Sequence, residues 1–189
     1  KKHFLDSLSF VFYIKDLADK KGIDIGTGAG FPGLPLKICF PDFKITLLDS
    51  SIKKIKFLEH IIKILRLENV NILYGRAEDL AKAEYREKYD VVLARALAEL
   101  PILIEICLPF VKIGGKFIAY KSDFEDELKK SQRILDIMGG KLQEIKEVKI
   151  PFLDAKRFLI VIEKQKSTPA QYPRKAGIPQ KKPIYPNIL

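Results

Sequence analysis

The apolar positions along the chain follow two alternating periods. Short β-rich runs recur, and between them apolar residues repeat at helical spacing, as at Ile55, Leu58 and Ile62. This alternation predicts an α/β protein in which helices cover a parallel sheet. The predicted strands are residues 22–26, 44–49, 69–74, 90–95 and 116–121, and the predicted helices are residues 3–18, a helix ending near 40, 52–67, a short helix near 78, 100–111 and 125–138.

The rhythm changes after Gly139 and Gly140. Residues 141–150 and 157–164 are predicted to be two strands with only a proline-containing loop between them. A connection that short joins antiparallel strands, because parallel neighbours need a long crossover. Five strand–helix units closed by an antiparallel hairpin are the layout of class I S-adenosylmethionine (AdoMet)-dependent methyltransferases, which have a Rossmann-like, doubly wound sheet. Nicotinamide dehydrogenases usually continue the parallel alternation and add a substrate domain, which we do not expect here.

The composition fits one globular domain. Of the 189 residues, 47% are hydrophobic and 31% are charged, which excludes a wholly disordered protein. Cys39 and Cys107 are too few and too far apart for a disulfide scaffold or a zinc site. The longest run without a charged residue, residues 25–36, is too short to span a membrane. We therefore expect a cytoplasmic monomer that binds neither a metal nor a membrane.

Basic residues and prolines concentrate at the end of the chain. The net charge is +10, and residues 164–189 hold six basic residues, no acid and five of the 11 prolines. Because proline removes a hydrogen-bond donor and fixes φ, we expect neither helix nor central strand there. The sequence thus predicts a methyltransferase domain over residues 1–164 and an extended basic arm over residues 165–189. This arm either runs along a polyanion or packs back on the domain.

A glycine-rich turn over residues 24–33 follows the first predicted strand, and its sequence permits two interpretations. A dinucleotide pattern, G-x-G-x-x-G, starts at Gly28, and Asp49 follows it by 21 residues. An acid-x-Gly-x-Gly pattern, the usual methyltransferase form, starts at Asp24 and includes Gly26 and Gly28. The motif alone does not exclude NAD. Together with the antiparallel hairpin, and with Pro32 lengthening the turn, it favours AdoMet as the cofactor.

Asp49 ends the second predicted strand. A carboxylate at that position can accept hydrogen bonds from both ribose hydroxyls of a nucleoside cofactor. The competing role, capping the next helix, suits Ser50 or Ser51 better. We therefore expect Asp49 to bind ribose.

Six short motifs occur in a fixed order over nearly the whole chain. They are HFLDSL (residues 3–8), DIGTGAGFPG (24–33), LLDS (47–50), GRAE (75–78), ARA (94–96) and TPxxYPRxxGxPxKxP (168–183). Together they resemble the bacterial 16S rRNA guanine-N7 methyltransferase family (RsmG, also called GidB). The resemblance implies AdoMet-dependent methylation of guanosine N7, at position 527 in bacterial rRNA numbering, within the 530 loop of 16S rRNA. Its partner would be 16S rRNA or the small ribosomal subunit.

The resemblance also implies a set of cofactor contacts. They lie at Gly26 and Phe31 in the glycine turn, at Ala77 and Glu78 after the third strand, and at Arg95 after the fourth. Residues that follow a parallel strand lie at the carboxyl edge of the sheet, where Ala77 and Glu78 can meet the adenine. The Arg95 guanidinium can bind the methionine carboxylate or an RNA phosphate.

The expected RNA contacts are basic residues in or after the same motifs. The candidate RNA-binding residues are Arg76, Lys121, Arg174, Lys175, Lys181 and Lys182. For Arg76, a contact with RNA and a structural ion pair within the protein are equally open. His3 and Asp6 are instead expected to pack against the domain and to start a helix.

The chain departs from the family in two places. Only two residues precede His3, where a helical segment is usual, and Ser122 replaces a common glycine.

The expected chemistry needs no catalytic base. Guanine N7 carries a lone pair and no proton, so no His–carboxylate arrangement is required and we expect a flat activity profile from neutral to moderately alkaline pH. The base must be unpaired, because A-form RNA buries N7 in a narrow groove. Two alternatives stay open: methylation of another RNA position or a protein, and a non-catalytic RNA- or ribosome-binding protein with a methyltransferase fold. A non-catalytic protein of this fold would be expected to have lost parts of the cofactor site. The presence of Gly26, Gly28, Asp49 and Glu78 therefore counts against that alternative.

Overall fold

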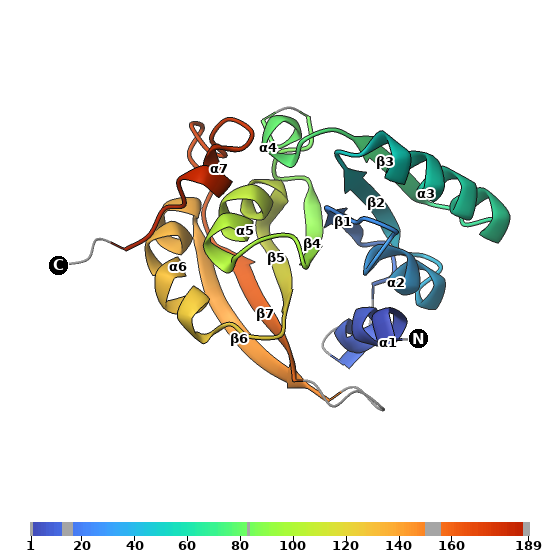
Figure 1. Cartoon of the computed structure of the whole chain (residues 1–189), viewed down its shortest axis with the longest axis horizontal. Helices are drawn as coiled ribbons and strands as arrows, with labels where there is room; N and C mark the ends of the chain where they lie inside the picture. The colour runs from blue at the N-terminus through green and yellow to red at the C-terminus, as the bar shows by residue number, and fades with distance from the viewer. Residues whose placement is uncertain (1, 13–16, 83, 150–155, 187–189) are drawn as a thin grey trace.

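The computed structural model describes residues 2–12, 17–82, 84–149 and 156–186. Within them, seven strands form one sheet in the order β3-β2-β1-β4-β5-β7-β6 (Figure 1). Neighbours among β1 to β5 are parallel, whereas β7 is antiparallel to both β5 and β6. This topology confirms the predicted fold class. The strands are β1 (Lys21–Ile25), β2 (Lys44–Asp49), β3 (Val70–Tyr74), β4 (Tyr89–Arg95), β5 (Val111–Lys121), β6 (Gly140–Val148) and β7 (Arg157–Lys164).

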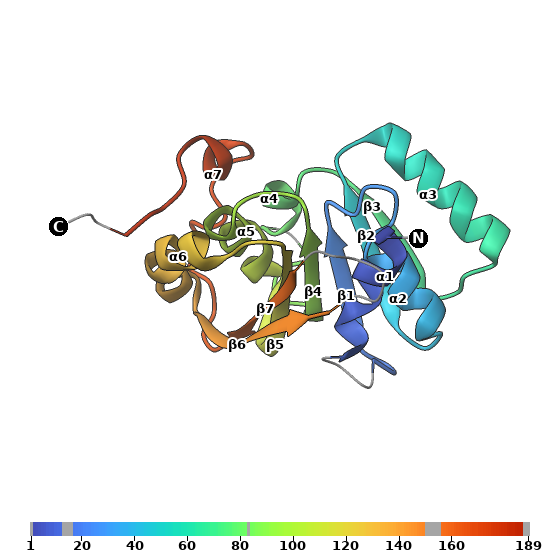
Figure 2. The same ribbon diagram turned by 60° about the horizontal axis from the view of Figure 1, so that its bottom comes forward.

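Helices cover both faces of this sheet (Figure 2). The α-helices are α1 (Lys2–Leu8), α2 (Gly33–Cys39), α3 (Ile52–Leu65), α4 (Ala77–Leu80), α5 (Leu100–Cys107), α6 (Glu125–Met138) and α7 (Ile178–Lys181), and the 3-10 helices are η1 (Ser9–Phe12) and η2 (Leu108–Phe110). Alternate residues of a strand point to opposite faces. In β4, Val92 and Ala94 pack into a core with α5 and α6, whereas Val91 and Leu93 pack into a second core with α2 and α3.

The strand order reverses at β1, which lies between β2 and β4. From β2 the chain continues to β3 on one side, and from β4 it continues to β5 on the other side. Such a reversal of strand order opens a crevice at the carboxyl ends of the central strands. The glycine turn, Asp49 and Arg95 all lie at this edge of the sheet. The topology therefore brings together residues that three separate motifs contributed.

Several element boundaries differ from those predicted. The first helix ends at Leu8 and continues as η1 to Phe12, where the aromatic and β-branched run 10–12 disfavours an α-helix; residues 13–16 lie outside the described part. The predicted helix 100–111 gives way to η2 at Leu108, because Pro109 removes a helical hydrogen-bond donor. β5 then begins five residues before its predicted start. The predicted strand 141–150 ends at Val148 in the structure, and Ile150 lies outside the described residues.

The prediction of an extended arm without helix is wrong at residues 178–181. This stretch forms α7, because Pro179 occupies the first turn, where the missing N–H has no intrahelical partner in any case. Both views show residues 165–186, here called the C-terminal segment, returning over α5 (Figures 1 and 2). Tyr172 and Ile184 of this segment pack against the core on the α5 side. Of the two alternatives for the segment, packing back on the domain is therefore observed.

Buried polar contacts hold the C-terminal segment in place. The Arg86 guanidinium donates to the carbonyl oxygens of Thr168 (2.6 Å), Pro169 (3.2 Å) and Tyr172 (2.9 Å). The fully buried Lys164 amine donates to the Leu108 carbonyl (2.8 Å) and to the Thr168 hydroxyl. Burial lowers the pKa of this lysine to about 8. These contacts fix the chain direction as it leaves β7.

None of the helices in the described part of the chain is long and apolar enough to cross a membrane. The same residues contain no cluster of His, Cys, Asp and Glu side chains that could hold a metal ion.

Candidate cofactor and substrate pockets

A pocket of about 240 Å³ lies at the carboxyl ends of β1 and β2. Four of the predicted cofactor residues, Gly26, Asp49, Ala77 and Glu78, line it together. The predicted Phe31 and Arg95 do not, and Gly28 reaches it only through Asp49. The other lining residues are Ile25, Leu48, Ser50, Lys54, Gly75, Arg76, Leu97, Ala98, Ile102, Ile106 and Gln180.

The Asp49 carboxylate is held rigidly at the wall of this pocket. It is 5% exposed, and its two oxygens accept hydrogen bonds from the backbone N–H groups of Gly28 and Ser51, both at 2.9 Å. The Lys54 amine lies 3.3 Å from one of the oxygens. A carboxylate oxygen has more than one lone pair, so acceptor capacity remains for a ligand. The ribose role of Asp49 stays a prediction, and the geometry suits it.

The glycine turn needs glycine for two different reasons. Gly26 and Gly28 have φ of 69° and 62°, a region that residues with a Cβ rarely adopt. A Cβ at Gly26 would also lie 2.7 Å from the Leu97 side chain, whereas one at Gly28 would meet no atom closer than 4.0 Å. Gly26 therefore brings backbone close to the pocket, and Gly28 turns the chain so that its N–H reaches Asp49.

Asp24 lies beneath the turn and is fully buried. One carboxylate oxygen accepts hydrogen bonds from the Thr27 hydroxyl (2.6 Å) and the Gly33 N–H (2.9 Å). The other oxygen, Oδ1, has no hydrogen-bond partner among the described residues. Burial raises the pKa of Asp24 to about 6, against the opposing effect of these two hydrogen bonds.

We expect Asp24 to make the stability of the protein fall between pH 4 and pH 6. Below pH 3.8 the carboxyl is protonated in both folded and unfolded chains; between 3.8 and 6 only the folded state retains the proton, so the unfolding free energy decreases as pH rises. About two pKa units correspond to about 3 kcal/mol. Urea unfolding at pH 4 and at pH 7 measures this difference in unfolding free energy, and Asp24→Asn should remove it. Asp136→Asn, at an exposed site, is the matched control, and an unchanged pH dependence in Asp24→Asn would contradict the assignment.

Glu78 joins the pocket to the C-terminal segment. It is 3% exposed, and its Oε1 accepts from the Gly177 N–H (2.9 Å) and from the Arg76 guanidinium (3.3 Å). Burial on its own raises the pKa of Glu78, but these donors and the N–H of Glu78 itself outweigh it, and the pKa lies below its ordinary value. Arg76 thus bridges to Glu78 while its side chain is 48% exposed, so a contact with RNA stays a prediction.

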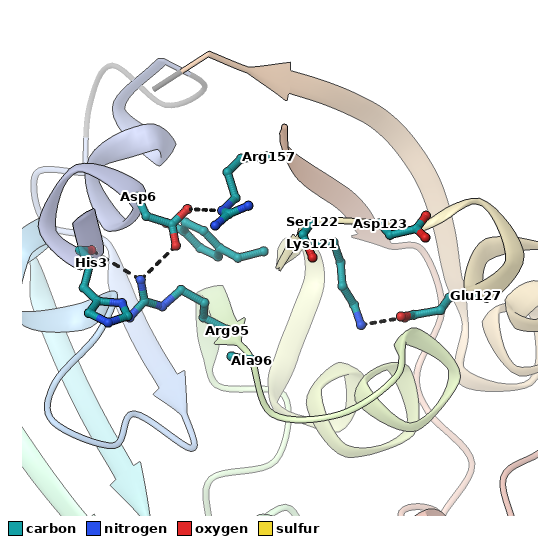
Figure 3. A pocket seen from close by; sticks show the side chains of 10 residues that line it. His3, Asp6, Arg95, Ala96, Lys121, Ser122, Asp123, Glu127 and Arg157 are labelled. Atoms are coloured by element: carbon teal, nitrogen blue, oxygen red, sulfur yellow. Dashed lines mark hydrogen bonds and ion pairs between the residues drawn. The ribbon is translucent and has the colours of Figure 1, made fainter. Parts of the chain in front are cut away.

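A second pocket, of about 470 Å³, lies beside the ends of β4 and β5 (Figure 3). Asp6 of α1 stands between Arg95 (2.9 Å) and Arg157 (3.3 Å). Arg95 also lies over the Phe31 ring, with its guanidinium carbon 5.3 Å from the ring centroid. The Lys121 amine pairs with Glu127 at 2.5 Å. Asp6, which the sequence assigned to packing, is therefore the centre of an ion-pair cluster that anchors α1 to the sheet.

The segment after β4 borders both pockets. Ala96 lines the second pocket, whereas Leu97 and Ala98 line the first. Ala96 has a φ of 51°, an unusual value for a residue with a Cβ. A short stretch of backbone therefore separates the predicted cofactor pocket from a larger pocket rich in charged side chains.

Apart from Arg76, which pairs with Glu78, the predicted RNA-binding residues divide into two groups. Lys175, Lys181 and Lys182 are exposed on the C-terminal segment. Arg174 and Lys121 are instead engaged by buried or half-buried carboxylates, those of Glu105 and Glu127. Sequence reasoning missed Arg157 and Gln180, because neither occupies a characteristic position in a motif. The RNA contacts stay predictions.

Residues 1–158 match the GidB family, described as rRNA small subunit methyltransferase G. The chain belongs to this family. The ribosomal RNA small subunit methyltransferases G of Alkaliphilus metalliredigens and Acetivibrio thermocellus are 51% and 50% identical to it. Both alignments cover 97% of this chain, and they cover 77% and 76% of those two proteins. The predicted family and, with it, the enzyme class of methyltransferase are confirmed.

Solved structures with low identity share the fold of this GidB-family chain. A SAM-dependent O-methyltransferase from Thermotoga maritima superposes with a TM-score of 0.64 at 16% identity, over 86% of this chain and 66% of that one. A precorrin-6y C5,15-methyltransferase from Geobacter metallireducens gives 0.59 at 18% identity, over 85% and 86%. These similarities support the class I methyltransferase fold and carry no information about the substrate.

Proposed function

We propose that the chain transfers a methyl group from AdoMet to N7 of a guanosine, nucleotide 527 in bacterial rRNA numbering, in the 530 loop of 16S rRNA. The observation that carries the proposal is the pair of pockets on either side of residues 96–98. One is lined by the buried carboxylates of Asp49 and Glu78, which suit a nucleoside, and the other is larger and lined by charged side chains. Such a substrate would place the enzyme in the cytoplasm, where we expect it to act as a monomer.

In the first pocket, the residues bind and orient the cofactor. Asp49 accepts from the ribose hydroxyls, the backbone of Gly26 allows close approach, and Ala77 and Glu78 lie beside the adenine. AdoMet, as a sulfonium, supplies the methyl group. Because guanine N7 has no proton to lose, the protein supplies alignment and exclusion of water, which can contribute up to ~7–11 kcal/mol.

The second pocket suits a guanine whose N7 must stay accessible. A bidentate arginine contact to O6 and N7 would block the nucleophile. Asp6 engages both arginines of this pocket, Arg95 and Arg157. This arrangement opposes that mode of recognition and leaves the Watson–Crick edge or stacking to select the base.

Nucleoside analysis tests this proposal. The protein is incubated with methyl-labelled AdoMet and with either naked 16S rRNA or 30S subunits, and the digested RNA is searched for 7-methylguanosine. We expect label in that nucleoside alone, with a rate that is flat from pH 7 to pH 9. Label in another nucleoside would favour the alternative RNA target. AdoMet binding without transfer to either substrate would favour the non-catalytic alternative.

The exposed lysines of the C-terminal segment give a separate test of RNA contact. Each phosphate neutralised on single-stranded RNA contributes about 0.7 to the slope of log affinity against log salt, so Lys181→Ala/Lys182→Ala is expected to flatten the slope by about 1.4. Deleting the whole segment would be a poor test, because Gln180 lines the predicted cofactor pocket and its loss would also change that pocket. Lys53→Ala/Lys56→Ala on α3, which covers the opposite face, is the control. An unchanged slope in the first variant would contradict RNA contact.

A further inference from the structure

The C-terminal segment supplies part of the wall of the cofactor pocket. Gln180 of α7 lines it together with Ala77 and Glu78 and with Ile102 and Ile106 of α5. α7 contacts α5 directly, and both views show it beside α4 and α5 (Figures 1 and 2). The side-chain amide of Gln180 makes no hydrogen bond with the described residues. The amide nitrogen of Gln180 can therefore donate, and its amide oxygen can accept, a hydrogen bond from a ligand in the pocket.

Tertiary contacts, rather than helix stability, hold Gln180 at this position. A helix of one turn is not stable by itself. Gly177, three residues earlier, donates its N–H to Glu78, and its carbonyl accepts from the Lys181 N–H at 3.1 Å. Arg174 is held by two side-chain hydrogen bonds to Glu105, at 2.8 and 2.6 Å. The bonds of Arg174 and Gly177 therefore fix the backbone that leads into α7, and the bond within α7 fixes the turn from which the Gln180 side chain extends.

The pocket residues around Gln180 match the chemistry of a purine. Ile102 and Ile106 offer apolar surface to a flat ring, while Oε1 of Glu78 is already occupied by Gly177 and Arg76. An adenine carries an exocyclic N–H donor next to a ring-nitrogen acceptor. A glutamine amide pairs with that edge through two hydrogen bonds, as it does in recognition of adenine bases.

We propose that Gln180 binds the adenine of AdoMet, with its amide oxygen accepting from the exocyclic amine and its amide nitrogen donating to a ring nitrogen. The inference rests on the proposed use of AdoMet and names a cofactor-binding residue outside the motifs that follow the sheet strands. It also assigns the C-terminal segment a binding role in addition to its charge.

Calorimetry with S-adenosylhomocysteine, the demethylated product, tests the assignment. We expect Gln180→Ala to bind it about 5- to 30-fold more weakly than the parent, as for the loss of two neutral hydrogen bonds. Gln180→Glu is also expected to bind more weakly than the parent, because a carboxylate can accept from the exocyclic amine but cannot donate to the ring nitrogen. Gln171→Ala, an exposed change elsewhere in the segment, is the matched control and should bind like the parent.

A second ligand separates hydrogen bonding from packing. S-inosylhomocysteine carries a carbonyl in place of the exocyclic amine, so the parent should prefer the adenosine form and Gln180→Ala should lose much of that preference. Equal weakening of both ligands would overturn the proposal and indicate a packing role. Unchanged affinity in Gln180→Ala would also overturn it while leaving the proposed function intact. Failure of the parent to bind AdoMet or its product would overturn both.

Discussion

Replacing Arg174 by alanine is expected to lower the free energy of unfolding by about 3–5 kcal/mol. Its partner Glu105 is 1% exposed and accepts the Arg174 backbone N–H and two guanidinium N–H groups at 2.6–3.0 Å. Truncation of Arg174 removes both guanidinium donors, and the buried Glu105 carboxylate then keeps only the backbone N–H of residue 174 from this interaction. Urea unfolding of the two proteins, with equal denaturant slopes, measures the difference.

A variant that removes both charges distinguishes loss of the pair from loss of packing. In Arg174→Met/Glu105→Gln no buried charge is left unpaired, so we expect it to be more stable than Arg174→Ala. A midpoint for Arg174→Ala equal to that of the parent would show that the carboxylate finds other partners, and would contradict the anchoring role given to this pair.

Asp49→Ala is expected to weaken AdoMet binding by tens- to several-hundredfold, or about 2–4 kcal/mol for two lost ribose hydrogen bonds. The variant also removes the acceptor of the Gly28 and Ser51 N–H groups, so part of the loss comes from the glycine turn. Calorimetry gives the affinity, and thermal melting without ligand reports any loss of structure. Binding as tight as that of the parent would show that the ribose assignment is wrong.

Lys54→Ala is the matched control for Asp49→Ala. It removes the more distant partner of the same carboxylate, 3.3 Å away, without removing an acceptor from the pocket. We expect a change of less than about tenfold, consistent with a half-exposed ion pair. NAD should bind neither protein, because the glycine turn belongs to a methyltransferase fold.

Local patterns were sufficient to predict the sheet and, with the family resemblance, four of the residues that line the first pocket. The alternation of periods and the short connection between β6 and β7 determine the strand directions without reference to distant residues. The position of Asp49 beside the turn also follows locally, since parallel strands place their carboxyl ends at one edge. Asp49 was predicted from this rule, whereas Gly26, Ala77 and Glu78 were predicted from the family resemblance; the structure brings these four residues together.

The C-terminal segment could not be predicted in this way, because its partners are far away in the sequence. Arg174 lies 69 residues from Glu105, and Gly177 lies 99 residues from Glu78. In a single sequence nothing distinguishes a carboxylate that will be buried against an arginine from one that faces solvent. The same applies to Asp6 and Arg95, 89 residues apart. Prolines correctly indicated an irregular course but not that Pro179 would begin a helical turn.

Gln180 is the last residue of the pocket lining to be translated, 74 residues after Ile106. Domains fold during synthesis as the nascent chain emerges from the ribosome. A nascent chain that has emerged only through β7 holds every strand of the sheet, the glycine turn and Asp49, but not Gln180 or the Gly177 bond to Glu78. The pocket therefore gains the last part of its wall, and α5 its Arg174 partner, only after the C-terminal segment has left the ribosome.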